Sequence, residues 1–246
     1  ILWELPLSRS WPRYSGTHLY LQATEDILCQ RSIWLPFDSM QIVKYGFGSE
    51  QILKIQELKK RLREKATSIR EEISNEAAAK AADTIATRFF RTWSPGRSKV
   101  IAGFWPIKSE INIRPLIENL YRAGCDIVLP EVVAPSKVLL FRKWTPGAQM
   151  TKGSYKTSVL TANAAVLEPD WILVPLLAFD RERFRLGYGG GYYDATLSQL
   201  AKKKEIFSIG VAYDIQEFDA VPKGSSDFQL DAVLTEKRVI QKEEKY

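Results

Sequence analysis

Trp-Ile-Leu-Val-Pro-Leu-Leu-Ala-Phe (Trp171–Phe179), followed by Arg-Leu-Gly-Tyr-Gly-Gly-Gly-Tyr-Tyr-Asp (Arg185–Asp194), is the stretch that decides the fold. Its apolar start predicts a buried strand over Trp171–Val174, and the residues from Tyr192 to Leu200 predict a helix. Four glycines lie between them. A glycine-rich turn between a strand and a helix is a typical phosphate site, because backbone N–H groups and the positive end of the helix face the anion.

The two common phosphate-binding patterns are absent from this loop. Counting from Gly187, Tyr192 stands where a Walker A loop and a dinucleotide-binding loop both require glycine, and no lysine follows. A bare glycine cluster is also compatible with a flexible hinge. The paired tyrosines and the flanking charges favour a binding loop, in which Arg185 clamps phosphate and Asp194 faces a metal ion.

A predicted helix from Ile52 carries three basic residues at helical spacing. Apolar residues recur along one stripe of it, at Ile55, Leu58, Leu62, Ile69 and Ile73. Lys59, Arg63 and Arg70 border that stripe, so we expect their charged ends at the edge of a cleft and their stems against apolar surface. The alternative is an ordinary solvated helix face.

Strands and helices alternate along the rest of the chain. This pattern predicts an α/β fold, a three-layer open and mostly parallel sheet with helices on both faces, similar to a Rossmann fold. We expect residues 1–50 to form an N-terminal extension and residues 51–246 a single domain. Further helices are predicted over Ser74–Phe90 and Arg114–Ala123, strands over Val100–Trp105, Ile127–Leu129, Val138–Arg142, Phe207–Ala212 and Ala232–Leu234, and a loop-rich region over 145–169.

Composition narrows the classes of function. The net charge of +6 is concentrated in residues 51–100, where 12 Lys or Arg face 6 Asp or Glu. Nucleic acid is one possible partner for this basic region. The region has no aromatic residues interleaved with the basic ones, however, so a small polyanion explains the excess charge equally well. Cys29 and Cys125 lack metal or redox spacing and His18 is the single histidine, which disfavours a His-based catalytic site and suits a reducing cytoplasm. We expect a monomeric cytoplasmic protein with no nucleic-acid or membrane partner.

Four segments together resemble one family. Arg185–Asp194 is similar to the signature of the 5-formyltetrahydrofolate cyclo-ligases, also called methenyltetrahydrofolate synthetases. Lys59-x-x-Leu62-Arg63 with Arg70 resembles their basic helix, and Trp105–Glu110 resembles their folate-side segment. Asp227 and Asp231 resemble their C-terminal acidic motif. The resemblance covers about residues 52–238 and implies the fold predicted above.

The resemblance also implies the reaction, in which ATP drives cyclisation of 5-formyltetrahydrofolate to 5,10-methenyltetrahydrofolate with release of ADP and phosphate. Reduced folate and ATP are the expected small-molecule partners and Mg²⁺ the expected cofactor. Asp194 and Asp227 are the expected metal ligands, and Arg185 and Lys59 the expected catalytic residues. The expected ATP site comprises Lys59, Arg63, Arg185, Leu186, Gly187, Tyr188, Gly189, Gly190, Gly191, Tyr192 and Tyr193. The expected folate site comprises Trp105, Glu110, Tyr188, Gly189, Gly190, Gly191 and Tyr192.

Topology predicts where these residues meet. In open α/β sheets ligands bind beyond the carboxyl ends of the strands. Glu110 follows the first predicted strand, the glycine loop follows the third, and Asp227 precedes the last, so we expect them to converge on one crevice. Neither Arg185 nor Lys59 is expected in the core.

The sequence also departs from the family pattern. Arg183 stands where the family usually has glycine, Asn112 and Ile113 where Asp and Thr are common, and Ala195 where Arg is frequent. Lys156–Val159 replaces a Gly followed by Glu-Pro or Gln-Pro. The altered 156–159 segment leaves open a non-catalytic folate- or nucleotide-binding relative, and the basic region leaves open a nucleic-acid-binding protein.

Overall fold

The computed structural model describes residues 37–153 and 158–242. The contacts divide the chain into a unit of residues 1–46 and a larger unit of residues 47–246. Helix α1 (Phe37–Glu71) crosses this boundary, and everything below concerns the larger unit. Among the helices of the described residues, none combines the length and the apolarity that a membrane crossing requires.

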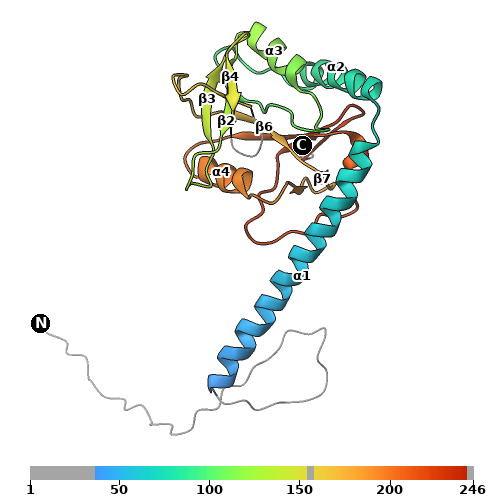
Figure 1. Cartoon of the computed structure of the whole chain (residues 1–246), viewed down its shortest axis with the longest axis vertical. Helices are drawn as coiled ribbons and strands as arrows, with labels where there is room; N and C mark the ends of the chain where they lie inside the picture. Colours follow the sequence, from blue (N-terminus) through green and yellow to red (C-terminus); the bar gives the residue numbers. More distant parts are fainter. Residues whose placement is uncertain (1–36, 154–157, 243–246) are drawn as a thin grey trace, which may run out of the picture. The chain divides into compact units, whose positions relative to one another are not determined.

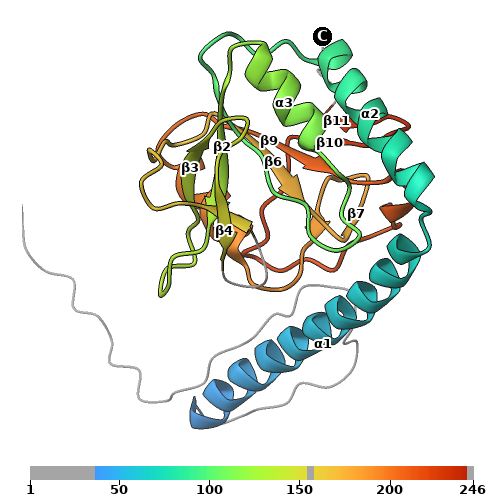
Figure 2. The ribbon, with the colours of Figure 1, turned by 45° about the horizontal axis from the view of Figure 1, so that its top comes forward.

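A seven-stranded, mostly parallel sheet organises the larger unit (Figures 1 and 2). The strand order is β11-β10-β9-β6-β1-β2-β3. The five inner strands are parallel, and the edge strands β3 and β11 are antiparallel to their neighbours. The bounds are β1 Val100–Ala102, β2 Asp126–Glu131, β3 Leu140–Trp144, β6 Trp171–Pro175, β9 Phe207–Val211, β10 Ala232–Leu234 and β11 Val239–Gln241. The predicted fold class is confirmed.

Helices cover both faces of this sheet because its strands alternate between two cores. Ile101 and Leu173 pack with α2 (Asn75–Thr92) and α3 (Arg114–Arg122). Their neighbours Ala102 and Ile172 point the other way and pack with α4 (Tyr192–Ala201). In Figure 1, α2 and α3 lie together and α4 lies across the sheet from them. Strands buried on both sides explain the continuous apolar runs in the sequence.

Local signals predicted two helix ends well. The Ser74 hydroxyl accepts a hydrogen bond from the Ala77 N–H at 3.2 Å and caps α2. After α3, Gly124 adopts a φ of +91°, the left-handed conformation that often ends a helix.

The order of the strands places a binding crevice. The chain leaves β1 toward β2 through α3, but it leaves β6 in the opposite direction, toward β9 through α4. Between adjacent strands β1 and β6 the direction of winding therefore reverses. Connections that diverge at such a switch point leave an opening at the carboxyl ends of the two strands, where α/β proteins bind ligands.

Some sequence predictions of elements were wrong. The strand predicted over Val100–Trp105 ends at Ala102, and α1 begins well before Ile52. The loop-rich region 145–169 contains a small antiparallel pair, β4 (Met150–Lys152) and β5 (Ser158–Leu160). The pair β7 (Ala178–Phe179) and β8 (Arg185–Leu186) was also missed. Strands of two or three residues are too short to show periodicity.

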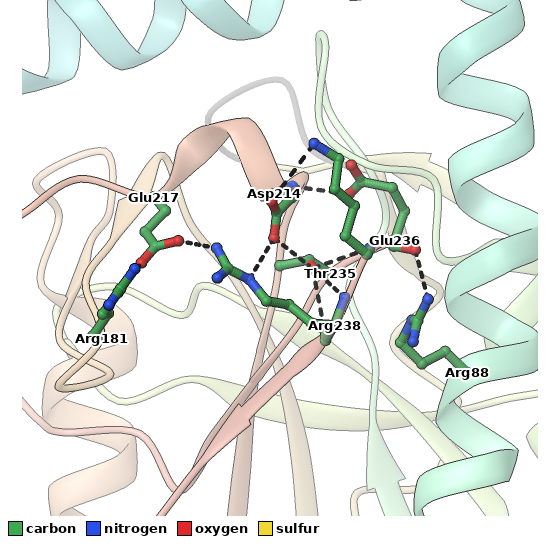
Figure 3. Close-up of polar contacts among 8 residues, drawn as sticks. Arg88, Arg181, Asp214, Glu217, Thr235, Glu236 and Arg238 are labelled. Carbon is green, nitrogen blue, oxygen red and sulfur yellow. Dashed lines mark hydrogen bonds and ion pairs between the residues drawn. The ribbon is translucent and has the colours of Figure 1, made fainter.

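A cluster of charged residues fixes the turn that follows β9 (Figure 3). Arg238, directly before β11, binds Asp214 at 2.9 Å and also pairs with Glu217, which Arg181 contacts from the β7–β8 turn. Between Asp214 and Glu217, the buried Gln216 amide donates to the carbonyls of Leu176 and Leu177 at 3.0 and 2.8 Å. The network therefore anchors the chain directly after β6, where the switch-point crevice begins.

Candidate active site

The basic side of α1 packs against the rest of the domain together with part of the predicted apolar stripe, since Leu62 and Ile73 are partly buried against the core clusters. Leu58 and Ile52 are exposed, whereas Ala66 and Arg70 are each about 1% exposed. The prediction that Leu58 lies on the buried face was wrong. The inward face also carries Lys59, Arg63 and Arg70, whose polar partners are Asp227, the Gly187 carbonyl and Tyr188.

Arg63 joins this helix to the glycine loop. Its Nε donates to the Gly187 carbonyl at 2.8 Å. A Cβ built on Gly189 would lie 3.3 Å from the Arg63 guanidinium, and Gly189 also has a φ of +103°. The positive φ therefore favours glycine at this position, and any side chain there would push the Arg63 guanidinium away by a few tenths of an ångström.

The remaining glycines shape the start of α4. A Cβ on Gly190 would come within 2.7 Å of the Tyr192 ring. Gly191 caps α4 with a φ of +72° and has no side chain with which to bond the first-turn N–H groups. These N–H groups, at the positive end of the helix, provide what an anion needs. Defined close approaches at Gly189 and Gly190 favour a shaped loop over a flexible hinge.

Arg185 is buried, contrary to the sequence-based expectation that it lies outside the core. It lies on β8 and is 7% exposed. Its guanidinium donates to Asp194 Oδ1 at 2.8 Å and to the Phe228 carbonyl at 2.9 Å. Burial lowers the pKa of Arg185, and the Asp194 charge opposes that shift. The β7–β8 hairpin folds Arg185 inward, where it holds both the start of α4 and the segment beside Asp227.

The segments that carry the two predicted metal ligands are in contact in the structure. Asp194 Oδ1 accepts the backbone N–H of Phe228, the residue after Asp227, at 3.0 Å. Asp227 Oδ2 accepts from Lys59 Nζ at 2.5 Å and from the Gly224 N–H at 2.6 Å. Lys59 and Asp227 are separated by 168 residues in the chain, so only the tertiary structure pairs them.

Each of these carboxylates uses one oxygen for the hydrogen bonds above, Oδ1 in Asp194 and Oδ2 in Asp227. Over residues 37–153 and 158–242, no group of three or more His, Cys, Asp or Glu side chains forms a metal cage. Mg²⁺ does not need one, since it typically takes one or two carboxylates and completes its shell with water and phosphate oxygens. The donor chemistry of the pair fits that ion.

Glu110 lies on the other side of the glycine loop and is buried, at 9% exposure. Its Oε2 accepts the Ile107 N–H at 2.9 Å. Burial raises the pKa of Glu110, while the Ile107 N–H, the Arg70 charge, the Tyr188 hydroxyl and the Lys108 charge act against that rise. The carboxylate is therefore a fixed acceptor and not an exposed surface group.

Trp105 lies next to this segment with its ring between two neighbours. The Arg114 guanidinium is 4.7 Å from the ring centroid, and the Trp144 ring centroid is 6.5 Å away. The ring is half-buried. It is held in place by packing and retains exposed surface.

Sequence reasoning missed Arg70 as a site residue, although it noted its position in the helix. Arg70 Nη2 donates to the Tyr188 hydroxyl at 2.6 Å, and Nε donates to Ser109 Oγ at 3.1 Å. The available signal was spacing, because Arg70 follows Arg63 by seven residues and so lies on the same side of the helix. Its contacts tie the glycine loop to the segment that holds Glu110.

The departures from the family pattern have different structural contexts. Arg183 has a φ of +69°, which explains why glycine suits this position. Its Nε nevertheless bonds the Leu230 carbonyl at 3.0 Å. Within the altered segment, Lys156 and Thr157 lie outside the described residues, and Val159 is buried in β5.

The contacts thus join Lys59, Arg63 and the glycine loop to Asp194 and Asp227. Arg70 joins the segment before Glu110 to the loop, through Ser109 and Tyr188. These are the segments predicted to converge at the switch point. Figure 2 shows the chain after β6 entering the hairpin that contains β7, beside α1. Which ligand each residue contacts remains a prediction from the sequence.

Comparisons with known proteins identify the relatives of this chain. The sequence profile described as the 5-formyltetrahydrofolate cyclo-ligase family matches residues 55–236. The Escherichia coli 5-formyltetrahydrofolate cyclo-ligase is 34% identical over 145 residues, covering 56% of this chain and 79% of the relative. The Haemophilus influenzae enzyme of the same name is 32% identical over 143 residues, covering 56% and 76%.

Solved structures agree with the sequence relatives. The 5,10-methenyltetrahydrofolate synthetase of Mycoplasma pneumoniae is 26% identical, with a TM-score of 0.59 over 72% of this chain and 98% of the other. The Aquifex aeolicus 5,10-methenyltetrahydrofolate synthetase is 27% identical, with a TM-score of 0.60 over 75% and 92%. Since the matched region contains six of the seven strands of the sheet, the glycine loop and the basic residues of α1, the chain belongs to the 5-formyltetrahydrofolate cyclo-ligase family and is a ligase.

Proposed function

We propose that this protein uses ATP and Mg²⁺ to cyclise 5-formyltetrahydrofolate to 5,10-methenyltetrahydrofolate, releasing ADP and phosphate. One observation carries the proposal beyond family membership. The helix that bears Lys59 and Arg63 packs directly on the glycine loop at the switch point, with Arg63 bonded to Gly187. Two cations, a turn of exposed amides and a helix start therefore surround one space, which suits a nucleotide triphosphate.

In this proposal the ATP side is formed by Lys59, Arg63 and the residues from Arg185 to Tyr193. Lys59 and Arg63 neutralise phosphate charge, and the loop amides orient the phosphates. The close approaches support this role, because Gly189 lies against the Arg63 guanidinium and Gly190 against the Tyr192 ring, so the loop has a defined shape. Arg185 acts indirectly in this proposal. It bonds Asp194 and so holds the start of α4, and it does not contact the phosphates itself.

Asp194 and Asp227 would hold Mg²⁺. When bound, the ion neutralises charge on the phosphate oxygens during transfer. Lys59 Nζ donates a hydrogen bond to Asp227 Oδ2. When ATP binds, a phosphate oxygen would become a second acceptor for the Lys59 ammonium, beside that carboxylate. Two neighbouring carboxylates otherwise repel each other, which favours a cation between them.

On the folate side, Glu110 would accept hydrogen bonds from the pterin ring and Trp105 would pack against it. The loop residues Tyr188–Tyr192 separate the two substrates. The formyl oxygen attacks the γ-phosphorus of ATP and ADP leaves. The neighbouring folate nitrogen then attacks the activated carbon and phosphate leaves. This sequence requires no protein nucleophile, so positioning and charge neutralisation supply the catalysis.

The direct test follows the methenyltetrahydrofolate absorbance after 5-formyltetrahydrofolate is mixed with the purified full chain and Mg·ATP, with ADP measured in parallel. We expect equal amounts of methenyl product and ADP. Omission of ATP should abolish both. Binding of folate or nucleotide without either product would exclude the ligase activity and support the non-catalytic alternative. Oligonucleotide binding that weakens steeply with salt would support a nucleic-acid partner instead.

The metal assignment has its own test. We expect Asp194→Asn and Asp227→Asn each to raise the Mg²⁺ concentration needed for half-maximal turnover, with the larger effect for Asp194. Folate binding without ATP should survive both substitutions. Unchanged Mg²⁺ midpoints in both variants would mean that ATP alone holds the metal and that these aspartates serve the fold.

We further propose that the protein works in the cytoplasm as a monomer. The buried Cys125 thiol is free, which suits a reducing compartment. Cell fractionation and light scattering during gel filtration test the two statements separately. A membrane or secreted fraction, or a mass twice that of the chain, would contradict them.

A further inference from the structure

Arg183, in the turn between β7 and β8, has a backbone conformation that ordinarily belongs to glycine. Its φ is +69°, in the left-handed region where a Cβ crowds the neighbouring carbonyl oxygen. A residue with a side chain persists in this region only where the surrounding structure holds it there. Glycine adopts the same φ without that cost. The cost is offset if the Arg183 side chain makes an interaction that glycine lacks.

The Arg183 side chain makes such an interaction with Leu230, which lies 47 residues away in the chain. Arg183 Nε donates to the Leu230 carbonyl at 3.0 Å, and the Leu230 N–H donates to the Arg183 carbonyl at 3.1 Å. Leu230 is buried and Arg183 is partly buried, so water competes little for these two bonds. The pair therefore fastens the β7–β8 turn to the chain shortly before β10.

The same turn binds both ends of a loop formed by residues 221–230. At the start of this 221–230 loop, the N–H of the buried Val221 donates to Asp180 Oδ2 at 3.0 Å. At its end, Leu230 bonds Arg183. Between these two points, residues 223–226 are exposed. The turn therefore holds the loop at its ends, through Asp180 at one and Arg183 at the other.

Other contacts between the turn and the 221–230 loop are more exposed to water. The Lys223 ammonium pairs with Glu182 and lies 4.0 Å from the centroid of the Phe184 ring. The Lys223 and Glu182 side chains are 46% and 66% exposed, and exposed ion pairs contribute little to stability. The bond between Arg183 and the buried Leu230 should therefore hold the loop more firmly than this ion pair does.

Asp227 lies in the 221–230 loop, and the loop itself places its carboxylate. The Gly224 N–H donates to Asp227 Oδ2 at 2.6 Å, and the Asp227 N–H donates to the Gly224 carbonyl at 3.2 Å. Leu230 follows Asp227 by three positions, so release of Leu230 from Arg183 should loosen the turn that carries this carboxylate. Phe228 is held separately by two bonds to other segments, so the loop should loosen without unfolding.

We propose that Arg183 is a positioning residue that fixes the end of the 221–230 loop and thereby holds the Asp227 carboxylate where it binds Mg²⁺. The proposal rests on the function proposed above, in which Asp227 is a metal ligand. In this arrangement Arg183 contacts neither substrate nor metal. Its guanidinium orders the loop, and this gain offsets the unfavourable φ of its backbone.

Two substitutions separate the side chain of Arg183 from its backbone. Arg183→Ala removes the guanidinium and keeps the unfavourable φ, whereas Arg183→Gly removes both. We therefore expect Arg183→Gly to unfold at a higher urea concentration than Arg183→Ala. Both should nevertheless raise the Mg²⁺ concentration needed for half-maximal turnover by about 3- to 10-fold, the scale of one net hydrogen bond. The KM for 5-formyltetrahydrofolate should stay unchanged. A wild-type Mg²⁺ midpoint in Arg183→Gly would overturn the proposal.

Metal binding can also be measured without turnover. Mn²⁺ suits the same carboxylate and water ligands as Mg²⁺, and its binding to the full chain with a non-hydrolysable ATP analogue is followed by electron paramagnetic resonance. We expect about 3- to 10-fold weaker binding in both Arg183 variants, and little further loss when Arg183→Gly is added to Asp227→Asn. Arg181→Ala is the matched control, because Arg181 lies in the same turn but pairs with Glu217, outside the loop. It should leave Mn²⁺ binding unchanged.

Amide hydrogen exchange distinguishes failure of this proposal from failure of the proposed function. The Gly224 and Phe228 N–H groups bond the Asp227 and Asp194 carboxylates, so their exchange rates in the metal-free full chain report opening of the loop. We expect both to exchange about 3- to 10-fold faster in both Arg183 variants, relative to the buried Leu173 amide of β6. Unchanged loop exchange overturns the positioning role. Faster exchange in a protein whose Mn²⁺ binding survives Asp227→Asn overturns the metal assignment on which the proposal rests.

Discussion

Replacing Arg185 should weaken the fold by much more than replacement of an exposed arginine. Arg185→Met keeps much of the apolar volume but removes a guanidinium that is 7% exposed and bonds both Asp194 and the Phe228 carbonyl. Removing one partner of a buried ion pair costs about 3 to 5 kcal/mol, because the other charge is left without compensation. Since the Asp194 side chain is 29% exposed, water relieves part of this cost, and we expect about 3 kcal/mol.

Urea unfolding measures this free energy, followed by circular dichroism at equal protein concentration. Arg181→Met is the matched control, because Arg181 pairs with Glu217 through a side chain that is 82% exposed. Exposed pairs contribute at most about 1 kcal/mol. Adding Asp194→Asn to Arg185→Met should recover part of the loss, because it removes the uncompensated carboxylate.

The outcome decides between two roles for Arg185. A loss of stability below about 1 kcal/mol, together with a large loss of turnover, would refute the structural role and restore the phosphate clamp expected from the sequence. A large loss of stability that Asp194→Asn does not relieve would refute the ion pair as its cause.

Three further predictions follow from the same contacts. Lys59→Ala should lower ATP-dependent turnover by about 10²-fold, whereas the exposed neighbour variant Lys60→Ala should not, and steady-state kinetics at saturating folate checks this; equal losses would contradict a specific role. Because burial raises the pKa of Glu110 above 4.5, the folded wild type loses stability as pH rises from the unfolded to the folded pKa, so Glu110→Gln should gain stability relative to wild type between acidic and neutral pH. Urea midpoints across that range test the sign, and a relative gain at acidic pH would refute it. A truncation beginning at Ser49 should keep its fold and turnover, because the family match starts at residue 55; insolubility or inactivity, by gel filtration and the absorbance assay, would show that residues 1–48 belong to the domain.

The fold and the meeting place of the site segments were accessible from local patterns. Alternating strands and helices predicted the mostly parallel sheet, because strands buried on both faces must be apolar throughout. Ser74 and Gly124 marked helix ends through interactions within a few residues. The glycine loop was recognisable for the same reason, since its shape depends on neighbouring atoms such as the Tyr192 ring beside Gly190.

The tertiary structure alone decided which charges meet. Periodicity predicted that Leu58 would be buried, yet the domain lies against the Lys59 side of the helix, where Asp227 provides a partner 168 residues away. Arg185 was expected at the surface because the two-residue strands that fold it inward have no sequence period. Arg70 acquired its role from Tyr188, 118 residues away. A sequence pattern determines which face of an element is apolar, but a buried charge depends on partners that only the folded chain brings within hydrogen-bonding distance.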